Sequence, residues 1–316
     1  MLGLVSYLVF FAIVVLVFAI AVLGLNLQWG FTGLFNAGVV GFYAVGGYTL
    51  AILTAPPRPE FLGGLGLPFV VGLAVAMGTS AAAAFVIGLA TIRLREDYLA
   101  IATFGVAVVI QLVALNFEAL TGGNLGIAAI PRPLAGWFDS PFAYNGFYLA
   151  LMAVAVGTVY WALERMVRSP WGRVLRAIRE DETAAVSLGK DARRFRLQAF
   201  VLGSMLVGLA GALYVAFIGY VSPFDFLPIV TFQMWTMLIV GGSGSNRGAV
   251  LGAAIVWGLW SLSGSLVARY LPSELQTQGG ALQVILIGLI LVLTLLFRPR
   301  GLIGEAPIVS RHLEDH

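Results

Sequence analysis

The side chains that could do acid–base, nucleophilic or metal chemistry are few and unevenly placed in this 316-residue chain. Residues 164–196 carry nine Lys/Arg and five Asp/Glu, so 14 of 33 residues there are charged, against 10% in the whole sequence. Both histidines, His312 and His316, lie near the C-terminal end, and cysteine is absent. A Cys/His site, a thiolate metal cluster and a Ser/His/Asp triad are therefore excluded. We expect no enzyme activity, no bound cofactor and no metal site.

The sequence also lacks an ATP-binding loop. The only Gly-Lys pair, Gly189-Lys190, is followed by Asp191 and lacks the upstream glycine that a P-loop requires. The net charge of +3 is too small to indicate a nucleic-acid partner. If the protein moves a solute, we therefore expect a partner protein to supply the energy by hydrolysing ATP.

The most charged stretch, RSPWGRVLRAIREDETAAVSLGKD (168–191), has the pattern of a short amphipathic helix. Ser169 and Pro170 favour a helix start, as N-cap and first helical residue, and Gly189 favours a stop. Asp181 could N-cap a second short helix, so one helix or two remain possible. The apolar residues of the stretch recur at helical spacing and form a seam: Val174, Ile178, Ala185 and Leu188.

Three surroundings fit such a helix: solvent next to the membrane, an anionic lipid surface, or a protein partner. Five acidic residues interleave with the basic ones between 164 and 196, whereas a lipid-facing helix is more purely basic. Mixed charge beside a small apolar seam favours the protein partner.

The elements that hold this stretch in place are predicted to be membrane spans. The sequence is 60% hydrophobic with 39 glycines, a composition typical of an integral membrane protein. Because lipid admits only helices or closed barrels, and the apolar runs lack a barrel's alternation, we predict an all-α polytopic membrane bundle of about 8–10 transmembrane helices. The glycines of the second run favour a broken or re-entrant helix. The candidate spans are 4–27, 31–54, 67–92, 98–117, 142–163, 197–221, 226–243, 248–268 and 281–297.

The distribution of Lys and Arg predicts the orientation. With 164–196 placed in the cytoplasm and the spans alternating, 15 of the 18 Lys/Arg fall inside, and only Arg58, Arg132 and Arg269 fall outside. The N-terminus is then outside and the C-terminus inside. We expect one transmembrane domain over 1–304 and a short cytoplasmic tail over 305–316.

None of the nine predicted spans contains Asp, Glu, Lys, Arg or His. Proton- and ion-coupled transporters generally keep such residues within the membrane. Their absence argues against a secondary transporter, although sodium coordination by backbone and amide oxygens stays possible.

The run Glu182-Thr-Ala-Ala-Val-Ser-Leu-Gly189 resembles the EAA-type loop of ABC importer permeases, in which Glu-Ala-Ala is followed three residues later by Gly. Here Thr183 separates Glu182 from the two alanines. The whole stretch 168–191 is more similar to the branched-chain amino acid ABC transporter permeases, a subfamily that includes urea and other amide or amino acid permeases. Further blocks resemble that subfamily in order, over nearly the whole chain: 24–53, 92–105, 121–127, 209–226, 237–253 and 296–302.

The resemblance implies the transmembrane half of an ATP-driven importer in a bacterial or archaeal cytoplasmic membrane. Its implied partners are a second, related permease subunit, two cytoplasmic ABC ATPases that bind ATP and Mg, a periplasmic or extracellular substrate-binding protein, and membrane lipid. The helix at 170–189 would sit in a groove on an ATPase. The residues that would carry this coupling are Arg173, Arg176, Arg179, Glu180, Asp181, Glu182, Ala184, Ala185 and Gly189.

The chain departs from the subfamily where its pathway would lie. Residues 34–38 read Leu-Phe-Asn-Ala-Gly where the family often has Ser-Leu-Gly-His-Ala, and residues 106–109 are apolar where an acid is common. A less charged pore suits a neutral or zwitterionic solute. Amides within or at the ends of spans either hydrogen-bond between helices or line the solute path; these are Asn36, Gln111, Asn116 and Gln233.

Together these patterns predict a permease subunit of an ABC importer for branched-chain or other small neutral amino acids. A urea or short-amide permease of the same family is the alternative within this class. Two other classes remain open: a self-sufficient secondary transporter or channel, and a non-transporting membrane scaffold that binds a cytoplasmic partner.

Overall fold

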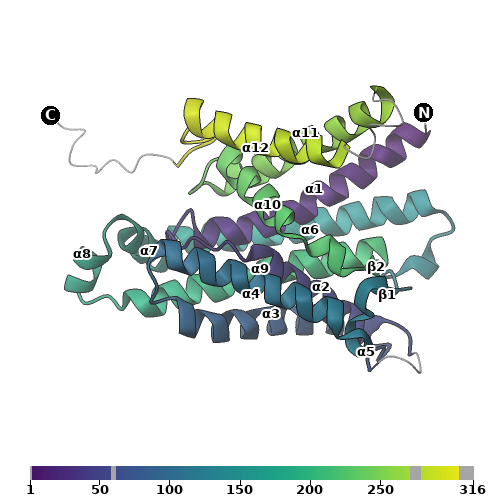
Figure 1. Cartoon of the computed structure of the whole chain (residues 1–316), viewed down its shortest axis with the longest axis horizontal. Coiled ribbons are helices and arrows are strands. Elements are labelled where there is room, and N and C mark those ends of the chain that lie inside the picture. The colour runs from purple at the N-terminus through teal and green to yellow at the C-terminus, as the bar shows by residue number, and fades with distance from the viewer. Residues whose placement is uncertain (1, 58–61, 271–278, 306–316) are drawn as a thin grey trace.

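The computed structural model describes residues 2–57, 62–270 and 279–305, and over these ranges the chain is a bundle of helices, as predicted (Figure 1). The one described sheet has two short antiparallel strands, in which Ile127 pairs with Val221. The α-helices are α1 (Leu2–Gln28), α2 (Val39–Thr54), α3 (Phe69–Thr91), α4 (Glu96–Asn116), α5 (Glu118–Thr121), α6 (Pro141–Arg168), α7 (Pro170–Glu180), α8 (Glu182–Ser187), α9 (Ala192–Ile218), α10 (Pro228–Gly241), α11 (Asn246–Tyr270) and α12 (Gly279–Phe297), and the strands are β1 (Ile127–Ala128) and β2 (Tyr220–Val221).

Seven of the described helices are long and apolar enough to cross a membrane, namely α1, α3, α4, α6, α9, α11 and α12. The other two predicted spans form shorter apolar helices. With 16 and 14 residues, α2 and α10 rise only about 24 Å and 21 Å, less than a hydrocarbon layer of about 30 Å. The polytopic helical membrane bundle is therefore confirmed, with two of its nine apolar helices incomplete as spans.

The helix expected over 31–54 begins only at Val39, after a non-helical loop that follows α1. Gly33 has φ +74°, a conformation that favours glycine, and the chain turns there. Asn36 Oδ1 then accepts a hydrogen bond from the N–H of Gly38 at 2.9 Å. The non-helical backbone of this α1–α2 loop is covered by protein, as polar backbone near a membrane must be.

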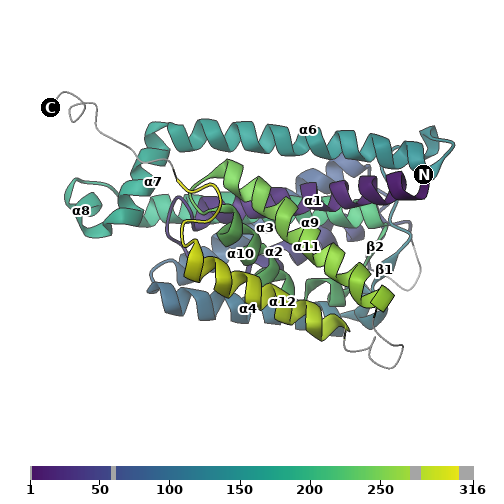
Figure 2. The same cartoon turned by 90° about the horizontal axis from the view of Figure 1, so that it is seen from above.

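The bundle has two distinct ends (Figure 1). The helices α7 and α8 project from one end, called here the α7–α8 end, and the β1–β2 pair lies at the other. α1 begins at the β1–β2 end, whereas α12 finishes at the α7–α8 end, so the chain makes an odd number of passages. Figure 2 shows α6 along one side of the bundle, leading directly into α7.

Small residues let the central helices approach closely. A Cβ on Gly208 of α9 would collide with Ser80 of α3, and a Cβ on Gly252 of α11 would collide with the carbonyl of Met237 on α10. The patterns Ser204-x-x-x-Gly208 and Gly248-x-x-x-Gly252 therefore serve close helix packing, as such patterns generally do in membranes.

Candidate functional site

The charged segment folds as two short helices rather than one. Asp181 ends α7, and its Oδ1 accepts a hydrogen bond from the N–H of Ala184 at 2.9 Å, which caps α8. Ser169 is the N-cap residue of α7 and Pro170 the first helical residue, as predicted, but the Oγ of Ser169 makes no capping hydrogen bond and donates instead to the carbonyl of Met166 at 2.6 Å. Gly189, with φ +77°, ends the second helix as predicted.

The apolar seam of this segment is shorter than its spacing predicts. Ile178, Ala185 and Ala192 form a small buried cluster that holds α7 and α8 against the start of α9, with Val174 packed beside it. Leu188 is 80% exposed, so its assignment to the seam is wrong. The break at Asp181 changes the helix phase, and it turns Leu188 outward into solvent.

The predicted coupling residues divide into an exposed set and a set that is partly or fully buried, which comprises Arg176, Arg179 and Ala185. Glu182 pairs with Arg196 of α9 at 2.8 Å, and Ala185 is buried. Arg176 is half-buried on α7. The exposed members of the set are Arg173, Glu180, Asp181, Glu182, Ala184 and Gly189. The segment therefore offers a surface of mixed charge, on which the apolar side chains of Val186 and Leu188 are also exposed.

Arg179 connects α7 to two distant parts of the chain. Its Nη1 donates to the carbonyl of Gly30 in the α1–α2 loop, and its Nη2 donates to Glu305 Oε2 at 2.7 Å and to Glu180 Oε1 at 2.7 Å. Desolvation by partial burial lowers the pKa of Arg179, but the hydrogen bonds and charges of Glu180 and Glu305 outweigh it, so the pKa is raised. Arg179 thus stays a cation that fastens α7 to the loop and to the segment after α12.

A second polar chain joins the same end of α1 to α6. Asn26 Nδ2 donates to Asn246 Oδ1 at 3.0 Å, and Asn246 Nδ2 donates to Glu164 Oε2 at 2.9 Å. The N–H of Gly244 donates to Asn26 Oδ1 at 2.9 Å. Because α6 runs into α7, this chain fixes the root of the charged segment against α1 and the loop before α11.

The α1–α2 loop that Arg179 holds also carries Asn36. The Nδ2 of Asn36 donates to Gln28 Oε1 at 2.9 Å, and Gln28 Nε2 donates to Ser204 Oγ at 2.9 Å on α9. The carbonyl of Asn36 accepts from Trp235 Nε1 of α10 at 3.0 Å. Asn36 is fully buried, and these hydrogen bonds connect the loop to α1 and α10 directly and to α9 through Gln28.

Three aromatic rings pack around this loop and are called here the aromatic trio: Trp29, Phe35 and Trp235. Their centroids lie 4.4 to 5.5 Å apart, at the short end of the separations usual for favourable ring contacts. Gly30, which accepts from Arg179, follows Trp29 directly. A displacement of α7 would therefore be transmitted through the contact of Arg179 with Gly30 to the neighbouring aromatic trio and to Asn36.

The four predicted pathway amides are not brought together. Asn36 and Gln233 are both buried, with Gln233 on α10 two residues before Trp235. Gln111 Nε2 donates to the carbonyl of Pro223 at 3.4 Å near the β1–β2 end, and exposed Asn116 donates to the carbonyl of Leu112 at 2.7 Å in its own helix. Sequence reasoning missed Asn26, Gln28 and Asn246, although amides that end or begin long apolar runs were a signal.

A polar groove of about 550 Å³ lies beside α8 at the same end of the bundle. Its lining combines Glu182 and Asp97 with four arginines, Arg93, Arg95, Arg193 and Arg196. The described residues include no group of three His, Asp or Glu placed to hold a metal ion. The chemistry available at this end is charge pairing with another molecule.

Comparison with known proteins identifies the family. The model of the branched-chain amino acid transport system permease component matches residues 7–295. The chain is 32% identical over 314 residues to the high-affinity branched-chain amino acid transport system permease protein LivM of Escherichia coli strain K12, covering 92% of this chain and 69% of that protein. No solved structure matches.

Two other relatives extend the likeness across the family. A probable branched-chain amino acid transport permease protein LivM of Methanocaldococcus jannaschii is 28% identical, covering 91% of this chain and 90% of the relative. The permease protein LivH of Escherichia coli strain K12 is 25% identical, covering 92% of each. The family match over residues 7–295 and these likenesses show that the chain belongs to the family of branched-chain amino acid transport system permease components.

Proposed function

We propose that this chain is a LivM-like transmembrane subunit of an ABC importer for branched-chain or other small neutral amino acids. Its identity is higher to LivM of Escherichia coli than to LivH, which supports a LivH-like protein as the second permease subunit. Two ATPase subunits bind ATP and Mg, and a substrate-binding protein delivers the solute. The α7–α8 end faces the cytoplasm, in keeping with the arginines gathered there.

The observation that carries this proposal is a charged segment exposed on one side and fastened to the bundle on the other. Val186 is 51% exposed and Leu188 80% exposed, beside Glu180 and Ala184. Apolar side chains held out among charges fit a groove on a soluble protein, because an apolar contact contributes affinity and the charges set the register. We assign this face to the ATPase.

The link through Arg179 then explains how ATP hydrolysis elsewhere acts on the transport path. Movement of α7 with the ATPase displaces Gly30, and with it the aromatic trio and Asn36. Packed elements of this kind change between discrete arrangements rather than bend continuously. The α1–α2 loop is therefore proposed as the element that opens and closes the path at the cytoplasmic end.

The transported solute is proposed to be neutral or zwitterionic. The spans contain no Asp, Glu, Lys, Arg or His over their predicted ranges, and a net-charged solute in so apolar a path would lack a partner. Asn36 and Gln233, which lie near Trp235, remain the pathway candidates closest to the proposed moving loop; Gln111 and Asn116 are candidates at the outer end.

Reconstitution tests the proposal. Vesicles are prepared with this chain, its LivH-like partner and both ATPase subunits. They should take up leucine only when ATP is present on the side of the membrane that holds the ATPases and the binding protein is present on the opposite side. Vesicles with this chain alone should take up none. ATP-independent uptake would favour a channel or secondary transporter. ATP-dependent uptake of urea but not leucine would keep the importer and change its substrate.

A further inference from the structure

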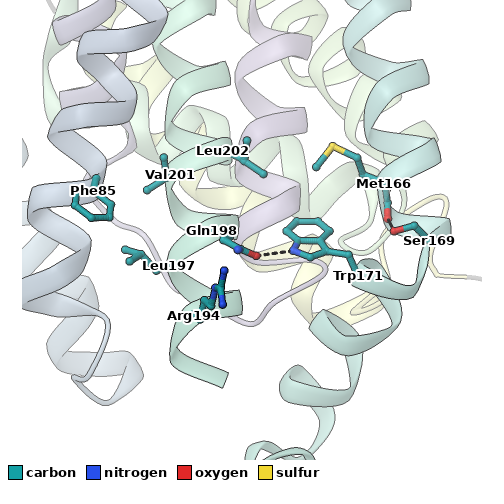
Figure 3. A pocket seen from close by; sticks show the side chains of 9 residues that line it. All are labelled: Phe85, Met166, Ser169, Trp171, Arg194, Leu197, Gln198, Val201 and Leu202. Carbon is teal, nitrogen blue, oxygen red and sulfur yellow. Dashed lines mark hydrogen bonds between the residues drawn. The ribbon is translucent and has the colours of Figure 1, made fainter. Parts of the chain in front are cut away.

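A cavity of about 520 Å³ opens between spans at the α7–α8 end, where α3, α6 and α9 meet α7 (Figure 3). Its upper wall is apolar and comes from three different helices: Phe85 of α3, Met166 of α6, and Leu197, Val201 and Leu202 of α9. The volume lies within the range of about 300–1,000 Å³ usual for small-molecule sites. The cavity is separate from the α1–α2 loop and from the groove beside α8.

Four polar side chains line this cavity: Ser169, Trp171, Arg194 and Gln198. Trp171 Nε1 donates to Gln198 Oε1 at 2.8 Å, which closes the base of the apolar wall. Figure 3 shows Arg194 beneath Gln198 and next to Leu197. The four ion pairs found among the described residues engage Arg168, Arg179 and Arg196. Arg194, which lines the end of the cavity called here the mouth, is in none of them.

We propose that this cavity binds a phospholipid with an anionic headgroup. One acyl chain lies against Val201, Leu202 and Met166, and the headgroup phosphate meets the guanidinium of Arg194. Trp171 sits at the boundary between the two, the level at which tryptophan is enriched in membranes. The order of chemistry along the cavity, apolar and then amide and cationic, matches the order along such a lipid.

The position of the cavity favours lipid over a soluble ligand. Its walls are sides of membrane spans, and Phe85 is 49% exposed on a helix whose next residue, Val86, is 66% exposed. Such a face meets hydrocarbon when the bundle is embedded. A single cation at the mouth supplies charge complementarity to one phosphate, and an arginine suits phosphate better than lysine because its donors form a fixed fork.

Occupancy would brace the joint between α6 and α7. Met166 and Ser169 are joined by a hydrogen bond of 2.6 Å at this joint, and Trp171 begins α7. A lipid between Met166 and α9 fills the space into which α7 would otherwise tilt. Anionic lipid is thereby expected to support function through this chain itself. Lipid binding requires only that the bundle is embedded in a membrane, so it is independent of which solute is transported.

The test is retention of lipid by the purified full-length chain, measured by native mass spectrometry. Phosphatidylglycerol and phosphatidylcholine with the same acyl chains are added in turn. Arg194→Gln should weaken phosphatidylglycerol binding about fivefold, the effect of one basic residue at a membrane surface, and leave phosphatidylcholine unchanged. Arg193→Gln is the matched control, because Arg193 is the adjacent arginine but lines the groove on the other side; it should bind like the wild type.

A second readout locates the bound chain. Brominated phosphatidylglycerol should quench the fluorescence of Trp171, measured as the difference between the wild type and Trp171→Phe, and Val201→Trp should fill the cavity and expel the lipid. Equal phosphatidylglycerol binding by wild type and Arg194→Gln overturns the proposal. So does competition by free glycerol phosphate alone, which would assign a soluble phosphate, or cross-linking of Phe85→Cys to the second permease subunit in the complex, which would assign a protein cover.

Discussion

The contact of Arg179 with Glu305 and Gly30 gives the sharpest test of the proposed relay. Replacing Arg179 by Gln removes a charge-assisted hydrogen bond to Glu305 and the bond to the carbonyl of Gly30. Charge-assisted hydrogen bonds contribute about 1.5–3 kcal/mol each. The side chains of Arg179 and Glu305 are 23% and 28% exposed, so solvent screens the pair only in part. We expect about 1–2 kcal/mol for the pair, which is a factor of roughly 5 to 30.

The assay is the number of solute molecules taken up per ATP hydrolysed by the reconstituted transporter. Arg179→Gln should lower this ratio roughly 5- to 30-fold while leaving basal ATP hydrolysis in place, because the exposed apolar residues Val186 and Leu188 are unchanged and the docking face loses only the pairing of Glu180 with Arg179. Glu305→Gln should lower it less, since the bond to Gly30 remains. Arg179→Lys should be intermediate, because one ammonium cannot reproduce the forked donors of a guanidinium.

The double variant separates a relay from unrelated damage. If Arg179 and Glu305 act through their contact, Arg179→Gln with Glu305→Gln should resemble Arg179→Gln alone, because the interaction can be lost only once. A wild-type ratio of uptake to ATP hydrolysis in Arg179→Gln would refute the relay. Fully additive losses in the double variant would refute the role of the pair.

Three further substitutions test the remaining parts of the site. Leu188→Asp should weaken ATPase binding about 10- to 150-fold in a pull-down titration, because burial of one leucine contributes about 1.5–3 kcal/mol. The control is Leu125→Asp, at a similarly exposed leucine near the opposite end, which should leave ATPase binding unchanged. Gly189→Val should reduce coupled uptake more than Gly189→Asn, because asparagine tolerates the positive φ and a Cβ there meets no neighbour. Gly38→Ala should lower the thermal midpoint in detergent, because its Cβ would meet the backbone carbonyl of Thr103, and Gly78→Ala in open space should not.

The positions of the spans could be predicted because hydropathy is a local property. Each predicted run contains an apolar helix, and the glycines of 31–54 indicated the interruption that the loop before Val39 provides. Asp181 is a possible cap by residue type, but the outward turn of Leu188 depends on the helix actually breaking there, which the sequence leaves open. When helical spacing is extended through a helix break, the residues after the break are assigned to the wrong face of the segment.

The polar chains could not be predicted, because their partners lie far apart in sequence. Asn26 and Asn246 are 220 residues apart, and Arg179 and Gly30 are 149 apart. Each side chain alone is an ordinary amide or arginine with many possible partners. Only the packing of α1 beside α11, and of the α1–α2 loop beside α7, selects among them, so these contacts are a property of the tertiary structure.

The contact between Arg179 and Glu305 also has a consequence for biosynthesis. Glu305 follows Arg179 by 126 residues, so at a synthesis rate of about 5–20 residues per second the arginine waits roughly 6 to 25 seconds for its carboxylate. In the proposed orientation α7 and α8 are then already on the ribosome side of the membrane, while α10, α11 and α12 are still being inserted. The proposed ATPase-docking face is thus synthesised before the Arg179–Glu305 ion pair can form, and an ATPase that docked during this interval would engage a subunit that cannot yet respond.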